Sequence, residues 1–354
     1  MKKGTVSQSK SSKRILPFLV FITVMTIASV FIGFLVYSTK LAAKDCSLAD
    51  DRFDCYESYY VELTKDSGVR LAVKDMRNVY DSDGFVKSQC HQLMHAVGRT
   101  AVEEYVNASN AFANGDPFCW SGYYHGVMEG IAFKMGVNNI TRNINLVCAD
   151  IPTKKQLSFD YYNCVHGIGH GIMFVKDHEL FQSLETCDKL NGTYEQSSCW
   201  GGVFMENVIA DYKNHNSRYL SPKDPFFPCN VVENKYEGSC YLMQTSYMLR
   251  ITNWDFSKVF GLCTQVEEDY RDICYKSLGR DASGMSTSNV EKTKNYCMLG
   301  KDYRQQSNCI VGAVNDFIAY FHSDVQAKDL CTSLNQELQA VCFQKANAYY
   351  KTFQ

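Results

Sequence analysis

Five of the eight histidines of this 354-residue chain lie close together in the sequence, each within a few residues of a cysteine. They include two pairs with a spacing of four residues, His91 with His95 and His166 with His170. A spacing of four places two side chains on one face of a helix, where both can bind the same metal ion. The fifth histidine, His125, lies between the two pairs and follows Cys119 by six residues.

Two glutamates extend this pattern: Glu129 follows His125 by four residues, and Glu206 follows Cys199 by seven. Imidazole and carboxylate groups are ligands for zinc, iron and other first-row transition metals. We therefore predict a transition-metal site for one or two ions, with these ligands: His91, His95, His125, Glu129, His166, His170 and Glu206. If the protein is an enzyme, a metal-activated water with a glutamate as base would carry the reaction.

Copper is a possible alternative metal. Met94, Met128 and Met173 each follow one of these histidines by three residues. A soft thioether combined with imidazole favours copper, so the sequence leaves the identity of the metal open among zinc, iron and copper.

The same pattern has an alternative interpretation as helix packing. Gly122, Gly126 and Gly130 are spaced four residues apart, which is typical of a close helix-helix contact, and a histidine beside them can serve packing alone. Packing would distribute histidines evenly along the chain. Their concentration between residues 91 and 170 favours a metal site instead.

The sixteen cysteines predict a framework of eight disulfides. From Cys148 onward they fall into pairs separated by 10 to 15 residues, and the second member recurs every 33 to 41 residues. Cys90 and Cys119 lack such neighbours and would pair with each other. The predicted pairs are Cys46–Cys55, Cys90–Cys119, Cys148–Cys164, Cys187–Cys199, Cys229–Cys240, Cys263–Cys274, Cys297–Cys309 and Cys331–Cys342.

This period is that of a two-helix repeat. In each segment the first cysteine ends one apolar stretch, a polar connection follows, and the second cysteine opens another stretch. No run of strand length alternates between apolar and polar residues. We predict an all-α fold of helical hairpins, each closed by a disulfide and stacked as an α-solenoid or an α/α toroid.

The N-terminal region predicts a membrane anchor. Residues 15–38 are uncharged, predominantly apolar and about long enough to cross a bilayer as a helix. Residues 1–14 contain five basic residues and no acidic one, which places this tail in the cytoplasm by the positive-inside rule. Residues 39–354 would then form an extracytoplasmic domain, in agreement with its many cysteines. A cleaved signal peptide is the alternative, but the apolar run is longer than a usual signal core.

Composition excludes some classes of function. With the basic tail removed, acidic residues outnumber basic ones, so the sequence gives no support for nucleic-acid binding. No phosphate-binding loop, dinucleotide fingerprint, nucleophile elbow or haem-attachment motif is present. Two functions remain: a membrane-anchored metal-binding protein or metalloenzyme, and a non-catalytic scaffold that binds a protein partner on a concave surface.

Overall fold

The computed structural model describes residues 46–105, 108–116, 118–119, 121–151, 158–209, 217–286 and 289–353. The predicted basic tail (1–14) and membrane anchor (15–38) lie outside these residues. Within the described ranges, no helix is both long and apolar enough to cross a bilayer. The chain divides into units Met1–Asp50 and Asp51–Gln354, and all the described helices belong to the second.

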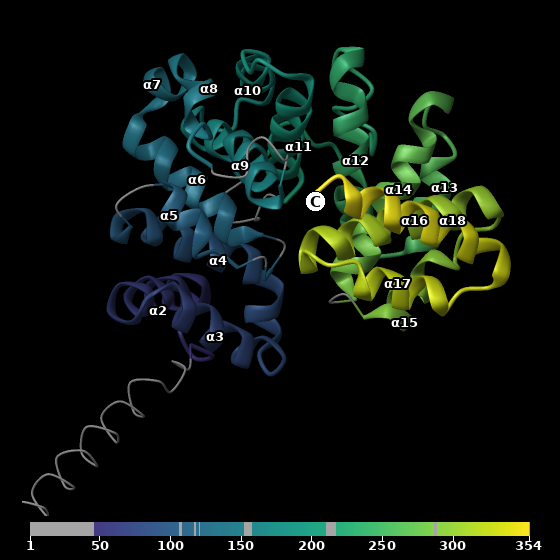
Figure 1. Ribbon diagram of the computed structural model, residues 1–354, viewed down its shortest axis with the longest axis horizontal. Coiled ribbons are helices and arrows are strands. Elements are labelled where there is room, and N and C mark those ends of the chain that lie inside the picture. The colour runs from purple at the N-terminus through teal and green to yellow at the C-terminus, as the bar shows by residue number, and fades with distance from the viewer. Residues whose placement is uncertain are drawn as a thin grey trace, which may run out of the picture. The chain divides into compact units, whose positions relative to one another are not determined.

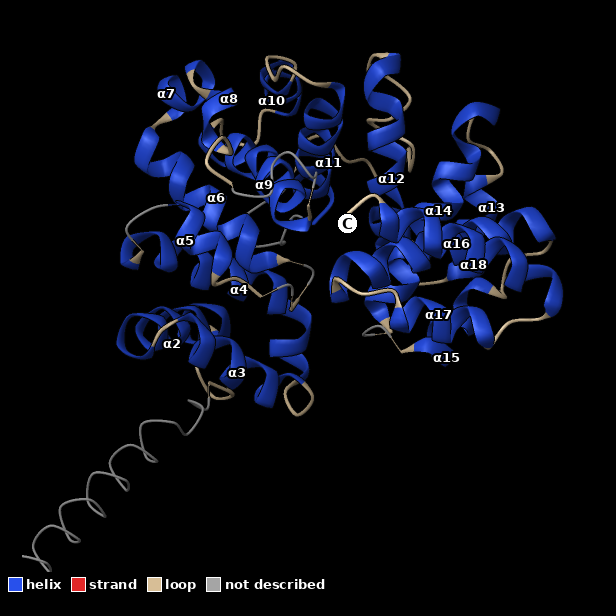
Figure 2. Cartoon of the chain, in the orientation of Figure 1, coloured by secondary structure: helices blue, strands red, loops and turns tan. Residues whose placement is uncertain are grey.

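The second unit is built from helices, and the described residues form no sheet, which confirms the predicted all-α class (Figures 1 and 2). The longer helices are α2 (Arg52–Ser67), α3 (Val69–Tyr80), α4 (Gly84–Glu104), α6 (Gly122–Met135), α9 (Phe159–Val175), α11 (Thr193–Ile209), α12 (Asn234–Ile251), α14 (Glu268–Met285), α16 (Tyr303–Phe321) and α18 (Gln336–Lys351). The shorter ones are α5 (Ala108–Ala113), α7 (Val137–Arg142), α8 (Ile144–Val147), α10 (Leu180–Cys187), α13 (Phe256–Cys263), α15 (Val290–Cys297) and α17 (Val325–Thr332).

Short polar side chains fix where many of these helices begin. Asp83 accepts hydrogen bonds from two backbone N–H groups at the start of α4, and Ser158 accepts one from Tyr161 in the first turn of α9. Such caps satisfy N–H groups that have no partner within the helix. The two helices that carry the histidine pairs therefore start at positions that the local sequence specifies.

Disulfides join each of the last short helices to the long helix that follows. Helices α10, α13, α15 and α17 each end at a cysteine or one residue beyond it, and that cysteine is bonded to one in the next long helix. The remaining bonds are Cys90–Cys119, Cys148–Cys164 and Cys229–Cys240, with Cys46 and Cys55 also in disulfides. All sixteen cysteines lie within the described residues and none is free, and these seven bonds confirm the corresponding predicted pairs.

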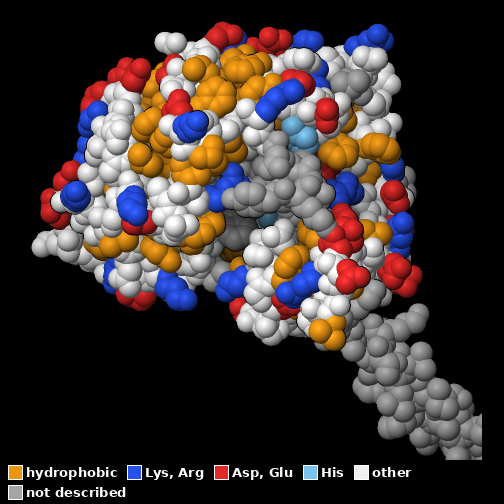
Figure 3. Space-filling view, turned by 180° about the vertical axis from the view of Figure 1, so that it is seen from behind, with side chains coloured by type: hydrophobic (Ala, Val, Ile, Leu, Met, Phe, Trp, Pro, Cys, Tyr) orange, Lys and Arg blue, Asp and Glu red, His pale blue; other side chains and the backbone are white. Residues whose placement is uncertain are grey.

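The long helices pack on one another in chain order. Helix α4 lies against α6, α6 against α9, α9 against α11, and the series continues through α12, α14, α16 and α18. Contacts between distant segments also occur: the Phe159 ring at the start of α9 stacks on His322 and on Phe353, with centroid distances of 4.4 and 4.0 Å. On the face shown in Figure 3, acidic and basic side chains are interspersed, with hydrophobic patches between them.

Glycines allow the helices that carry the histidines to approach closely. A Cβ atom at Gly126 on α6 would overlap the carbonyl oxygen of His95 on α4. Gly202 on α11 has the same relation to the carbonyl oxygen of His166 on α9. The close contact predicted at Gly126 is therefore present, and Gly202 adds one that the sequence did not predict; both bring the backbones of the histidine helices against their neighbours.

Candidate metal centre

All seven predicted ligand residues come together in the interior between four helices. His91 and His95 extend from α4, His125 and Glu129 from α6, His166 and His170 from α9, and Glu206 from α11. All are buried, and His91, the most exposed of them, retains only 7% of its surface accessible. The spacing of four residues places each pair on one face of its helix, and the packing of consecutive helices then brings these faces together.

The first group consists of His91, His95 and His125, whose ligand nitrogens lie within 4.8 Å of one another. The Nε2 atoms of His91 and His95 are 3.0 Å apart, and Nδ1 of His125 lies 3.3 Å from Nε2 of His91. Two nitrogens bound to one tetrahedral zinc at about 2.0–2.1 Å are separated by roughly 3.3 Å. The observed separations of 3.0 and 3.3 Å lie within about 0.3 Å of this value.

The second group consists of His125, His166 and His170, again with ligand nitrogens within 4.8 Å of one another. The Nε2 atoms of His166 and His170 are 3.4 Å apart, which also matches two ligands of one ion. The rings of His125 and His170 stack with centroids 3.7 Å apart.

His125 is common to both groups. The five imidazoles therefore form two triads that share one member. A neutral imidazole has only one nitrogen with a free lone pair, so His125 would have to lose its ring proton to offer one nitrogen to each of two ions.

The geometry of His91 and His95 conflicts with an isolated pair of neutral imidazoles. Nδ1 of His91 lies 2.9 Å from the carbonyl oxygen of Cys119, and Nδ1 of His95 lies 2.6 Å from Oε1 of Glu129. Both oxygens only accept hydrogen bonds, so each Nδ1 must carry the proton and each Nε2 must carry a lone pair. The two lone pairs then face each other at 3.0 Å, and a cation between them removes the repulsion.

Both glutamates lie behind the imidazoles instead of within the triads. His95 donates from Nδ1 to Glu129, and His170 donates from Nδ1 to Oε2 of Glu206 at 2.7 Å. A carboxylate that accepts the Nδ1 proton of a metal-binding histidine fixes the tautomer and raises the basicity of Nε2. Sequence spacing cannot distinguish this role from direct ligation, because in both cases the glutamate side chain must point from its own helix toward the histidines.

Arg99 holds the first of these carboxylates in place. It donates from Nη1 to Oε2 of Glu129 at 2.6 Å and from Nη2 to Oε1 of Glu57 at 2.8 Å. A continuous chain of hydrogen bonds thus connects Glu57, at the edge of the protein, to His95 in the centre.

Burial keeps four of the five imidazoles neutral. It lowers the pKa of His91 to about 3, with a further contribution from the adjacent His95, and it lowers the pKa of His166 to about 4. Burial likewise lowers the pKa of His125 and His170 well below the usual value. Neutral imidazole is the protonation state from which histidine binds metal, so these four rings are ready to bind at neutral pH.

Sequence reasoning missed several neighbours of the centre. The hydroxyl of Tyr162, one turn before His166, lies 3.4 Å from Nδ1 of that ring, and the backbone of Ser198 hydrogen-bonds to His166. The spacing of Tyr162 could have revealed it, but a backbone partner on another helix leaves no sequence signal. Met94 and Met128, by contrast, were named from the sequence as candidate copper ligands; both are fully buried and face Gly122 and Gly167 of the neighbouring helices.

No protein family, curated protein or solved structure matches this chain. Function is therefore argued from the geometry of the centre.

Proposed function

We propose that this protein is a metal-binding protein whose buried histidine cluster holds two transition-metal ions, with His125 shared between them. The observation that carries the proposal is the pair of Nε2 atoms of His91 and His95. They face each other at 3.0 Å while both Nδ1 atoms point at acceptor oxygens. A proton shared between the two Nε2 atoms is the alternative bridge, and the metal content of the protein distinguishes it from an ion.

The ligand set favours zinc or iron, with copper possible. Each triad provides three imidazoles, and three protein ligands leave a coordination position for water or a substrate, as in catalytic zinc sites. A carboxylate behind one imidazole of each triad strengthens the ligand field at that position. A metalloenzyme is thus compatible with the centre, and the reaction would take place at the open positions.

We further propose that residues 15–38 anchor the chain in a membrane and that residues 39–354 lie outside the cytoplasm, in stacked helical hairpins. The oxidised state of the cysteines supports this location, because disulfides persist mainly in oxidising compartments. The chain-order packing of the long helices supports the stacking. Alkaline phosphatase fused after residue 354 should be active, because this enzyme requires an oxidising compartment; an inactive fusion would contradict the location.

Elemental analysis by mass spectrometry of the full-length chain tests the metal centre. The protein would be produced in an oxidising compartment, purified in detergent and compared with a His125→Ala/His170→Ala double variant. The matched control is His178→Asn: His178 lies outside the cluster with a positive φ of 56°, which asparagine tolerates. We expect about two ions per chain in the native protein and the control, and a large loss in the double variant without unfolding.

Each outcome has a defined meaning. One ion per chain would contradict the sharing of His125 but leave the metal centre standing. A native chain that contains no metal and takes up none from zinc, iron or copper would refute the proposal. The predicted alternative, a non-catalytic scaffold in which histidines serve packing, would then account for the cluster.

A further inference from the structure

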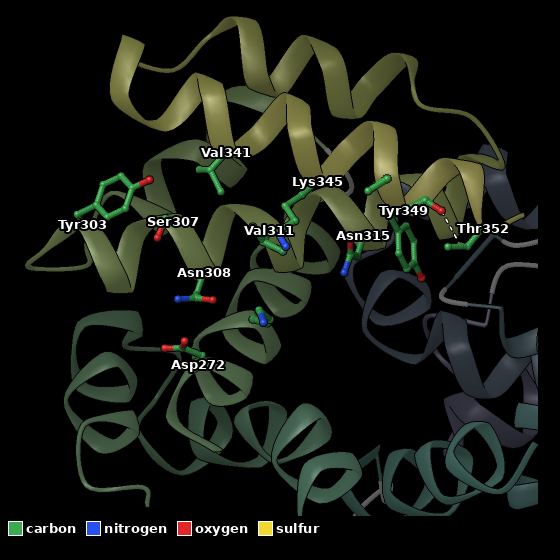
Figure 4. Close-up of a pocket in the computed structure, with 12 residues that line it drawn as sticks. Asp272, Tyr303, Ser307, Asn308, Val311, Asn315, Val341, Lys345, Tyr349 and Thr352 are labelled. Carbon is green, nitrogen blue, oxygen red and sulfur yellow. Dashed lines mark hydrogen bonds between the residues drawn. The ribbon is translucent and has the colours of Figure 1, made fainter. Parts of the chain in front are cut away.

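The C-terminal helices form a cavity that is separate from the metal centre. It lies among α14, α16 and α18 and has a volume of about 600 Å³ (Figure 4). Binding sites for small molecules commonly enclose about 300–1,000 Å³, so this cavity can hold several residues of a peptide.

The cavity has a positive charge excess. Lys276 on α14 and Lys345 on α18 both line it, and neither forms an ion pair with any residue in the described ranges. The one acidic residue in the lining, Asp272, is bound by Arg304 at 2.6 Å. Two ammonium groups are therefore available for an anionic ligand, while the lone carboxylate is already neutralised.

Two asparagines on α16 add hydrogen-bonding groups beside the lysines. Asn308 donates from Nδ2 to the backbone carbonyl of Arg304, which leaves its side-chain oxygen and a second N–H. Asn315 forms no hydrogen bond with the described part of the chain. Figure 4 shows Lys345 reaching from α18 toward α16, with Asn308 and Asn315 on either side.

The rest of the lining is largely apolar or aromatic. Val311, Val341 and Tyr349 line the cavity along the same helices (Figure 4). A small free anion would leave these surfaces unused. An extended peptide uses them for its side chains, and its backbone N–H and C=O groups match the donor and acceptor of an asparagine amide.

We propose that this cavity binds an extended acidic peptide, with Lys276 and Lys345 pairing with its carboxylates and the asparagines with its backbone. The residues that line the cavity include none of the seven candidate ligands of the metal centre. A free dicarboxylate shares the charge of such a peptide but lacks its backbone, which allows the two ligands to be told apart.

Fluorescence anisotropy tests this with full-length protein and a short fluorescein-labelled peptide rich in glutamate. The comparison ligands are the same peptide with glutamine in place of glutamate, and free glutarate as a competitor. The variants are Lys276→Met/Lys345→Met and Asn315→Ala. The matched control is Lys292→Met, at an exposed position on α15 outside the cavity. Circular dichroism and thermal unfolding establish that every variant is folded.

We expect the native protein and the Lys292→Met control to bind the acidic peptide and not its glutamine counterpart. The double lysine variant should lose at least about tenfold in affinity, the loss typical of removing one charged hydrogen bond. Asn315→Ala should weaken binding less, and raising the salt concentration should weaken it further. Equal affinity in the native and double-variant proteins would overturn the proposal, as would glutarate binding as tightly as the peptide.

Discussion

Replacing Glu129 with glutamine tests whether the carboxylate supports a metal ligand from behind. Glu129 is buried and accepts hydrogen bonds from His95 and from Arg99, both at 2.6 Å. A glutamine has one acceptor oxygen, so its NH2 group must face one of these two donors. Glutamine also lacks the negative charge by which Glu129 raises the basicity of His95 Nε2.

The expected effect is a loss of metal affinity with the fold retained. Removing an outer carboxylate partner of a metal-binding histidine typically costs about 10- to 100-fold in affinity, or about 1.4–2.8 kcal/mol. The metal-free chain should also lose about 1–3 kcal/mol of stability, because one buried donor is left without an acceptor. The two losses are measured separately, by metal titration and by chemical unfolding.

Competition with a chromophoric chelator measures the affinity of the metal-depleted full-length chain for zinc. Glu57→Gln is the matched control, because Glu57 bonds to Arg99 but not to any histidine. Glu206→Gln is the counterpart in the second triad, where His170 is the donor. If two ions bind, Glu129→Gln should weaken one binding step and Glu206→Gln the other. An affinity in Glu129→Gln within about twofold of the Glu57→Gln control would refute the supporting role.

Three further predictions follow from the same geometry. The metal-free chain should lose stability as the pH falls from about 6.5 toward 4, by on the order of 3 kcal/mol from His166 alone. The pKa of His166 is about 4 in the folded state and about 6.5 in the unfolded state, so the unfolded state takes up the proton first. Unfolding in urea across this pH range, after removal of metal by a chelator, measures the loss. The Cys187→Ser/Cys199→Ser variant should lose about 3 kcal/mol in the same assay, because the disulfide closes a loop with a sequence separation of 12; a loss under about 1 kcal/mol would contradict this. Gly202→Ala should reduce metal content and thermal stability because its Cβ meets a backbone carbonyl, whereas Gly261→Ala, where the space is open inside a helix, should leave the metal content unchanged and keep or slightly raise the stability.

Much of the fold could be predicted from the sequence because its determinants are local. A disulfide that closes a short helical hairpin joins cysteines close in the chain, so spacing alone indicated Cys187–Cys199 and the other short-range pairs. The absence of period-two alternation excluded sheets for a similar reason. Cys90 and Cys119, 29 residues apart, were paired only by elimination, and the structure confirms that bond as well.

The candidate site was only partly predictable. A spacing of four residues fixes that His91 and His95 share a helix face, and likewise His166 and His170, whatever the tertiary structure. Whether the two faces meet depends on how different helices pack. That packing involves contacts between residues more than 30 positions apart in the sequence.

Tertiary structure alone decided the role of each group in the centre. The placement of His125 in both triads and the positions of Glu129 and Glu206 behind the imidazoles follow from the rotation and approach of neighbouring helices. Spacing fixes the direction of a side chain relative to its own helix. The atom that the side chain contacts belongs to another helix, so its position depends on packing. The sequence by itself therefore determined which residues form the centre, and packing determined whether each one is a candidate ligand or a supporting carboxylate.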